Sequence, residues 1–169
     1  MYEVTIDRSK TCSFTGHRDI PDAMESHLFQ RVIDGVHYLY SKKIKTFLAG
    51  GAIGFDTLAA KAVIECRKLH QDIRLILVLP CQDQARRWKQ SDIDTYEHIK
   101  DLADEVICLS DHYYSGCMHN RNRYLIDNSS ACICYLTQES GGTAYTVKYA
   151  RNSGLSIFNL AHRKKQPAN

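Results

Sequence analysis

The chain has 169 residues, 44% of them apolar and 24% charged, with a formal net charge of +3. This length predicts one soluble domain with a substantial core, and the small charge argues against nucleic acid as a partner. The first residues, MYEVTIDRSK, lack the apolar segment of a secretory signal, and the run Leu75–Pro80 is too short to cross a bilayer. We therefore expect a cytoplasmic protein with no membrane segment, ending in a frayed basic tail over residues 162–169.

The seven cysteines are odd in number and form no CxxC motif. Most lie in apolar runs, as Cys108, Cys132 and Cys134 do, so we expect buried free thiols in a reducing compartment. One short segment gathers possible metal ligands without any standard zinc spacing: Asp111, His112, Cys117 and His119. The sequence therefore predicts no metal site.

Strand and helix patterns alternate from the N-terminus onward. Residues Thr11–Thr15 predict a first strand, and a helix begins at Pro21 and Asp22. Apolar residues then recur at helical spacing: Leu28, Phe29, Val32, Ile33, Val36 and Tyr40. Thr46–Ala49 predicts a second strand, and the helix after it has an apolar stripe: Leu58, Ala62, Cys66 and Leu69. The apolar run Ile73–Leu79 is typical of a central parallel strand buried on both faces.

The second half continues the alternation. The polar stretch Cys81–Asp104 predicts a helix with Gln84 and Trp88 one turn apart, and Asp111–His119 predicts an irregular segment. The remaining strands and helices are predicted at these positions: strands Glu105–Ser110, Ala131–Thr137 and Leu155–Leu160, and helices Asn120–Asn128 and Thr143–Asn152.

This order predicts an α/β fold: a Rossmann-like, doubly wound, mainly parallel sheet flanked by helices, in a single domain over residues 1–169. In such folds ligands bind beyond the carboxyl ends of the strands. Five loops follow those ends and hold most of the unusual residues of the chain: Thr15–Arg18, Gly50–Asp56, Pro80–Trp88, Asp111–Cys117 and Gln138–Thr143. We expect them to form one composite site.

The segment Leu48–Ala60, LAGGAIGFDTLAA, is a glycine-rich turn between a strand and a helix. Glycines let the backbone approach a ligand closely and leave the first amides of the helix free for an anion. The candidate ligand-binding residues here are Gly50, Gly51, Ala52, Gly54 and Asp56. Asp56 either caps the helix or holds a ribose hydroxyl. Neither a GxGxxG fingerprint nor a P-loop lysine is present.

The turn after the first strand contains Thr15, Gly16, His17 and Arg18. Arg18 offers a planar fork suited to phosphate, and His17 could donate to phosphate or act as an acid or base. The alternative is a surface turn with an ordinary salt bridge.

A second glycine turn, SGGT, covers Ser140–Thr143. It places Gly141, Gly142 and Thr143 at a helix start, with Thr146 one turn later, which is the arrangement that anion binding requires. Alone it could be a plain capped loop, but the first glycine turn favours a ligand.

Two further pairs are ligand-binding candidates. Arg121 and Arg123 lie close to a positive helix end, which indicates either an anionic neighbour or exposure with pairing to nearby acids. Gln84 and Trp88 share a predicted helix face, where Trp88 either stacks on a base or covers the core.

Taken in order, several segments resemble the YpsA family of the SLOG superfamily, which also includes the Smf/DprA proteins and the LOG phosphoribohydrolases. The segments are FTGHR (Phe14–Arg18), GGAIGFDTLAA (Gly50–Ala60), PCQDQARRW (Pro80–Trp88) with Tyr96, RNRYLIDNS (Arg121–Ser129) and SGGTAYTVKYA (Ser140–Ala150). The resemblance covers nearly the whole chain. It implies a Rossmann-like fold and a site for a nucleotide or a nucleotide derivative of the ADP-ribose or NAD type.

The related families imply different activities. LOG enzymes cleave a base from a nucleoside monophosphate and carry a glutamate shortly after a PGGxGT loop, whereas the loop here is SGGT and Ala144–Lys148 contains no carboxylate. DprA-like proteins bind single-stranded DNA and share the GGAxGxD element, here Gly50–Asp56.

These observations lead to three hypotheses. The first is a nucleotide-binding protein of sensor or regulatory type, which needs no cofactor and could form a homo-oligomer. The second is a hydrolase acting on an N-glycosidic or phosphate-ester bond of a nucleotide, with His17, Asp56 and Glu139 as catalytic candidates. The third is single-stranded DNA binding, which the small net charge disfavours.

Overall fold

The computed structural model describes residues 4–161, so the predicted basic tail lies outside the described residues. Six strands form one sheet in the order β4-β3-β2-β1-β5-β6. The strands are β1 (Thr11–Gly16), β2 (Thr46–Ala49), β3 (Arg74–Leu79), β4 (Glu105–Cys108), β5 (Ala131–Tyr135) and β6 (Ser156–Asn159). The helices are α1 (Asp22–Ser41), α2 (Phe55–Arg67), α3 (Gln90–Leu102), α4 (Cys117–Asp127) and α5 (Gly142–Asn152), preceded by a short 3-10 turn, η1 (Arg8–Lys10).

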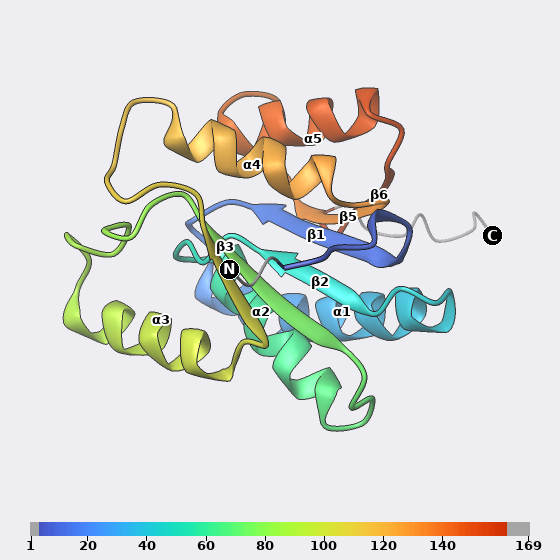
Figure 1. The fold of residues 1–169 in the computed structure, drawn as a ribbon. Coiled ribbons are helices and arrows are strands. Elements are labelled where there is room, and N and C mark those ends of the chain that lie inside the picture. Colours follow the sequence, from blue (N-terminus) through green and yellow to red (C-terminus); the bar gives the residue numbers. More distant parts are fainter. Residues whose placement is uncertain (1–3, 162–169) are drawn as a thin grey trace.

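All neighbouring strands pair in parallel, which confirms the predicted doubly wound α/β fold. From β1 the chain builds outward to β4, then returns to the other side of β1 and adds β5 and β6. Figure 1 shows α1, α2 and α3 on one face of the sheet and α4 and α5 on the other. The strand order therefore reverses between β1 and β5, where folds of this class bind ligands.

The core confirms the apolar patterns of the first half of the chain. Leu28, Val32 and Val36 of α1 are buried at helical spacing, and β3 is fully buried from Leu75 to Leu79. The stripe of α2 ends earlier than expected, because that helix stops at Arg67 and leaves Leu69 71% exposed. Within residues 4–161 no helix is both long and apolar enough to span a membrane.

The prediction of one helix over Cys81–Asp104 is wrong in its first third. Residues 82–87 form turns, and α3 begins only at Gln90, so Gln84 and Trp88 do not share a helix face. The backbone is instead tied to the next strand–helix connection: the Gln82 amide donates to the Ser110 carbonyl at 3.1 Å, and Asp83 accepts from the Tyr113 amide at 3.1 Å. These long-range bonds replace the local ones that a helix would need.

Two other predictions differ from the structure, one in the edge strand β4 and one in the helix that follows it in the chain. Helix α4 begins at Cys117 rather than Asn120, directly after Gly116 in the left-handed conformation. Cys108 is exposed rather than buried, because β4 has a neighbour on only one side and its outward residues face solvent. The other six thiols are buried and free, as expected.

The loops after β1 and β2 interlock. The Phe55 amide donates to the His17 carbonyl at 3.1 Å, and a Cβ on Gly16 would lie 2.4 Å from the Phe55 ring. Gly54 has φ +88°, and a Cβ there would lie 2.1 Å from the Arg18 carbonyl oxygen. Only glycine fits this contact, so the glycine at position 54 fixes where Arg18 lies.

We predict that Gly54→Ala destabilises the protein far more than Gly154→Ala. Both positions have positive φ, but a Cβ at Gly154 meets nothing within 4 Å. The control should lose about 1–2 kcal/mol from backbone conformation alone. The clash with Arg18 should add about 1–3 kcal/mol at Gly54. Urea unfolding of both variants measures the difference, and equal losses would contradict the interlock.

Candidate functional site

The carboxyl edge of the sheet collects the N-termini of the helices that follow β1 to β5. Three of these helices, α2, α4 and α5, are preceded by Gly54, Gly116 and Gly141, with φ of 88°, 93° and 97°, and none of the three has a side-chain cap. The first amides of a helix lack partners inside it and carry the positive end of the helix dipole. This edge therefore presents several uncapped positive helix ends.

The predicted SGGT turn forms the start of α5. A Cβ on Gly142 would meet nothing within 4 Å, and one on Gly141 would meet only the Gln138 side chain, at 3.5 Å. Ser140 is exposed and Thr143 half-buried. Thr146 is 1% exposed, and its hydroxyl donates to the Gly142 carbonyl at 2.9 Å, so Thr146 supports the first turn from below. The space above the start of α5 is open.

His17 joins the two loops that flank the reversal of strand order. Its Nε2 atom accepts a hydrogen bond from the Thr137 amide at 3.0 Å, and its ring meets Tyr135 edge-on with centroids 5.9 Å apart. An Nε2 that accepts a bond carries no proton, so the neutral ring holds its proton on Nδ1. His17 thus links β1 to the loop before the SGGT turn, while Thr15 is 6% exposed beneath it.

A buried pair of opposite charges supports the first glycine turn. Arg121, 4% exposed, donates to the carbonyl oxygen of Gly50 and approaches that of Val78 at 3.5 Å. Asp56, 7% exposed, accepts from the Ala52 amide at 3.2 Å. A Cβ on Gly50 would lie 2.5 Å from Arg121 Nη1 and 2.8 Å from Asp56 Oδ2. Both charged groups therefore pack directly against the turn, and Asp56 bonds the loop before α2 rather than acting as an N-cap residue.

The charges of this cluster influence one another. Burial raises the pKa of Asp56, while Arg121, the Ala52 amide and Arg18 act in the opposite direction. Burial also lowers the pKa of Arg121, which Asp56 opposes and Arg18 reinforces. Two guanidinium groups thus share one carboxylate, and the exposed one, Arg18, leaves a positive charge at the surface.

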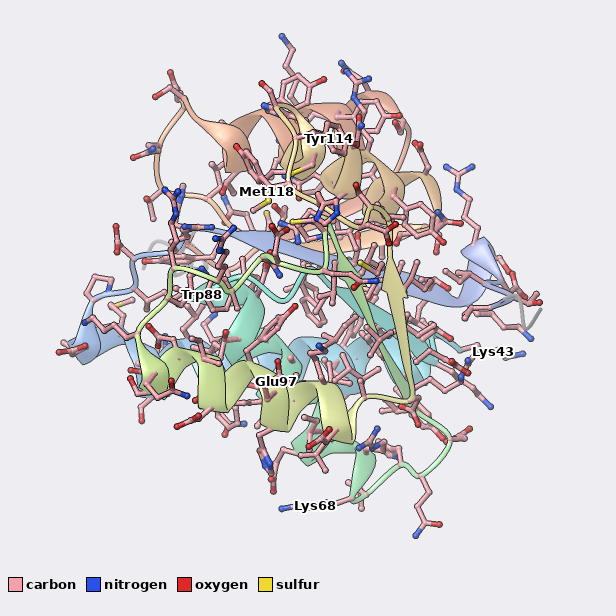
Figure 2. The ribbon with its side chains drawn as sticks, turned by 60° about the vertical axis from the view of Figure 1, so that its left-hand side comes forward. Lys43, Lys68, Trp88, Glu97, Tyr114 and Met118 are labelled. Atoms are coloured by element: carbon pink, nitrogen blue, oxygen red, sulfur yellow. The ribbon has the colours of Figure 1, made fainter. Side chains whose placement is uncertain are left out.

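Two clefts meet at Arg18 and Trp88. The first, of about 590 Å³, lies among α1, α2 and α3, and its lining includes Phe29 and Leu58. The second, of about 740 Å³, is called the arginine cleft below; its lining includes Arg18, Arg86, Arg87, Trp88, Tyr113 and Met118. Figure 2 shows Trp88, before α3, and Met118, in the first turn of α4, on facing sides of this region. Sequence reasoning missed Arg86 and Arg87, although the basic pair directly precedes Trp88 in a predicted ligand loop.

Buried polar groups without partners lie beside the arginine cleft. Within residues 4–161 neither the Gln84 amide nor the Tyr96 hydroxyl has a hydrogen bond of normal geometry. Both side chains also lie close to Gly51, where a Cβ would be 3.4 Å from Gln84 Nε2 and 3.3 Å from the Tyr96 ring. Trp88 packs edge-on against Tyr96 with centroids 5.3 Å apart, so it covers the core and lines the cleft at once.

The structure places some of the predicted site residues away from the Asp56–Arg121 pair and the arginine cleft. Arg123 lies over the rings of Tyr145 and Tyr149, at 5.8 and 5.6 Å, on an exposed surface between α4 and α5. Glu139 is exposed beside the SGGT turn. Among the described residues no three His, Cys, Asp or Glu side chains are grouped so that they could hold a metal ion.

Solved structures of DNA processing protein A share this fold. The Helicobacter pylori protein, described for its single-stranded DNA binding mode, matches 92% of this chain and 67% of its own with a TM-score of 0.66 and 16% identity. The Streptococcus pneumoniae protein matches 88% of this chain with a TM-score of 0.63 and 17% identity, and there the match spans about half, 49%, of the solved chain.

Similar curated proteins include one described as uncharacterised and several described as UPF0398 proteins. An uncharacterised SPbeta prophage-derived protein, YoqJ, of Bacillus subtilis (strain 168) is 26% identical over 76% of this chain and 82% of its own length. A UPF0398 protein of Bacillus cereus (strain B4264) is 25% identical over 80% of this chain and 71% of its own. The family model YpsA, described as the YspA SLOG family, matches residues 22–159. The chain therefore belongs to the YpsA family of SLOG proteins.

Proposed function

We propose that this protein binds a nucleotide or a nucleotide derivative, as a cytoplasmic sensor or regulatory domain. The observation that carries the proposal is the pair of glycine-led, uncapped helix starts, α2 and α5, on either side of β1 at the reversal of strand order. Helix starts of this kind bind phosphate through backbone amides that lack a partner inside the helix. At α2 the first amide, that of Phe55, already donates to the His17 carbonyl, so α5 offers the more open start. Membership of the SLOG superfamily supports the same ligand class.

The roles of the site residues follow from their placement. Phosphate would bind the amides of Gly142 and Thr143, over which the space is open. Arg18, exposed and next to Gly54, would add charge, and Trp88 would flank the base. Arg121 and Asp56 would hold the Gly50 turn in shape from below rather than touch the ligand, since both are buried.

Binding without turnover fits the three catalytic candidates best. His17 already accepts a bond through Nε2, and Asp56 is buried against the Ala52 amide. A general base must reach the proton that it removes. Glu139, exposed next to the SGGT turn, is thus the residue on which a hydrolase would depend.

We predict that Gly142→Asp abolishes nucleotide binding while the fold is kept. A Cβ at this position would meet nothing within 4 Å, and the new carboxylate would favour the start of α5 but repel phosphate. Gly142→Asn, with the same shape and no charge, should bind at least about tenfold more tightly than the aspartate variant. Thermal shifts with ADP-ribose, NAD, AMP and ATP measure this, because binding to the native state raises its melting temperature. A wild-type protein that none of the four stabilises at millimolar concentration would refute the proposal.

We also predict no release of base from AMP or other nucleoside monophosphates by the wild-type protein. Chromatography of long incubations would detect free base. Release that disappears in Glu139→Gln would establish the hydrolase instead.

Single-stranded DNA is the second candidate, favoured by three arginines and two aromatic rings in one cleft and by the likeness in fold to a protein described for that binding. If this candidate is right, the protein binds an oligonucleotide, and the logarithm of its binding constant falls with the logarithm of the salt concentration. The slope should be about −0.7 for each phosphate that the protein contacts. Binding of that kind, together with no stabilisation by mononucleotides, would replace the first proposal with this one.

A further inference from the structure

The arginine cleft carries positive charge that the described part of the chain does not neutralise. Three guanidinium groups line it, from Arg18, Arg86 and Arg87, together with a single carboxylate, Asp83. That carboxylate is already engaged by the Tyr113 amide at 3.1 Å and by the Cys81 thiol. Among residues 4–161 none of the three arginines forms a salt bridge. The lining chemistry is that of a site for an anion.

The start of α4 adds to this charge. Met118, in the first turn of α4, lines the cleft, and the turn contains no acidic residue. Gly116 before it provides no side-chain cap. The positive end of the α4 dipole therefore borders the same space as the arginines.

The cleft also offers groups that recognise a nucleoside. Trp88 is held in place by Tyr96, and Tyr113 is 66% exposed, so two aromatic faces are available next to the guanidinium groups. Gln84 lines the cleft, and its buried amide lies beside the buried Tyr96 hydroxyl, whose pKa it lowers against the effect of burial.

The arginine cleft is too far from the SGGT turn for one phosphate to occupy both. The cleft follows β3 and the turn follows β5, and three strand spacings of about 4.8 Å separate these strands, or roughly 14 Å. An arginine side chain extends several ångströms from the backbone, so a phosphate bound by Arg86 or Arg87 can lie closer to the turn than the strands themselves do.

We propose that the arginine cleft is a second phosphate subsite, and that the ligand is a nucleotide with two separate phosphate groups on different positions of its sugars. One group binds the α5 glycine turn and the other binds Arg86 and Arg87, with Arg18 between the subsites. This inference rests on the nucleotide-binding function proposed above and specifies its ligand class.

Two matched pairs of probes test it, because the members of each pair differ by one remote phosphate. AMP is compared with adenosine 3′,5′-bisphosphate, and NAD with NADP, by calorimetric titration of the full chain. The wild-type protein should bind the member with the extra phosphate at least about tenfold more tightly in one pair or both. Arg86→Gln/Arg87→Gln should abolish that preference and leave AMP and NAD affinity within about twofold.

A charge-matched control is Lys42→Gln/Lys68→Gln, at the C-terminal ends of α1 and α2 and so at the opposite end of the sheet. It removes the same two charges and should keep the preference for the extra phosphate. A preference that both double variants lose would reflect net charge alone and would overturn the subsite.

The two proposals fail in distinguishable ways. Equal wild-type affinity within both pairs would overturn the second subsite and leave nucleotide binding intact. Wild-type protein that binds none of these four probes, and that neither ADP-ribose nor ATP stabilises, would overturn both.

Discussion

The constraint on which the molecule depends is the parallel sheet. Because all the strands run in parallel, the chain must cross back to the same end of the sheet after each strand from β1 to β5. The five helices that make these crossings therefore start at one edge, where the strands end. Uncapped positive helix ends therefore accumulate where the strands finish, whatever ligand they meet. Gly116 and Gly141 leave the starts of α4 and α5 without a capping side chain, and Gly54, before α2, packs against the Arg18 backbone. The topology thus places positive helix ends at one edge of the sheet, and the residues of the loops there determine which groups a ligand would meet.

A single guanidinium connects the two layers of helices at this edge. Arg121 belongs to α4, on one face of the sheet, and donates to the Gly50 carbonyl in the turn before α2, on the other face. Its charge is balanced by Asp56 in the first turn of α2. Burying such a pair costs desolvation energy, and removal of either partner leaves the other charge uncompensated. The pair therefore serves to fix the shape of the turn more than to increase stability.

Strands and helices with their own apolar periodicity could be predicted from the sequence, as the buried run that became β3 shows. The segment before Trp88 could not, since its conformation depends on bonds to Ser110 and Tyr113, almost thirty residues away. Arg121 and Arg123 looked equivalent because only Asn122 separates them in the chain. Residues two apart on a helix do not face the same way, so one is buried under the glycine turn and the other lies against Tyr145 and Tyr149. The arginine cleft could not be predicted either, because its lining comes from loops that are far apart in the sequence.

The contact of Gly54 with the Arg18 backbone has a consequence for how the site meets a ligand. Because the two loops share one van der Waals surface, the α2 turn and the arginine beside it move together or not at all. This side of the site is preorganised, and little conformational entropy is lost there on association. The segments around Trp88 and Ser140 are joined to their neighbours by hydrogen bonds instead, from the Gln82 amide to the Ser110 carbonyl and from the Thr137 amide to His17. A ligand that reaches the α2 turn therefore meets the Arg18 backbone in a fixed position.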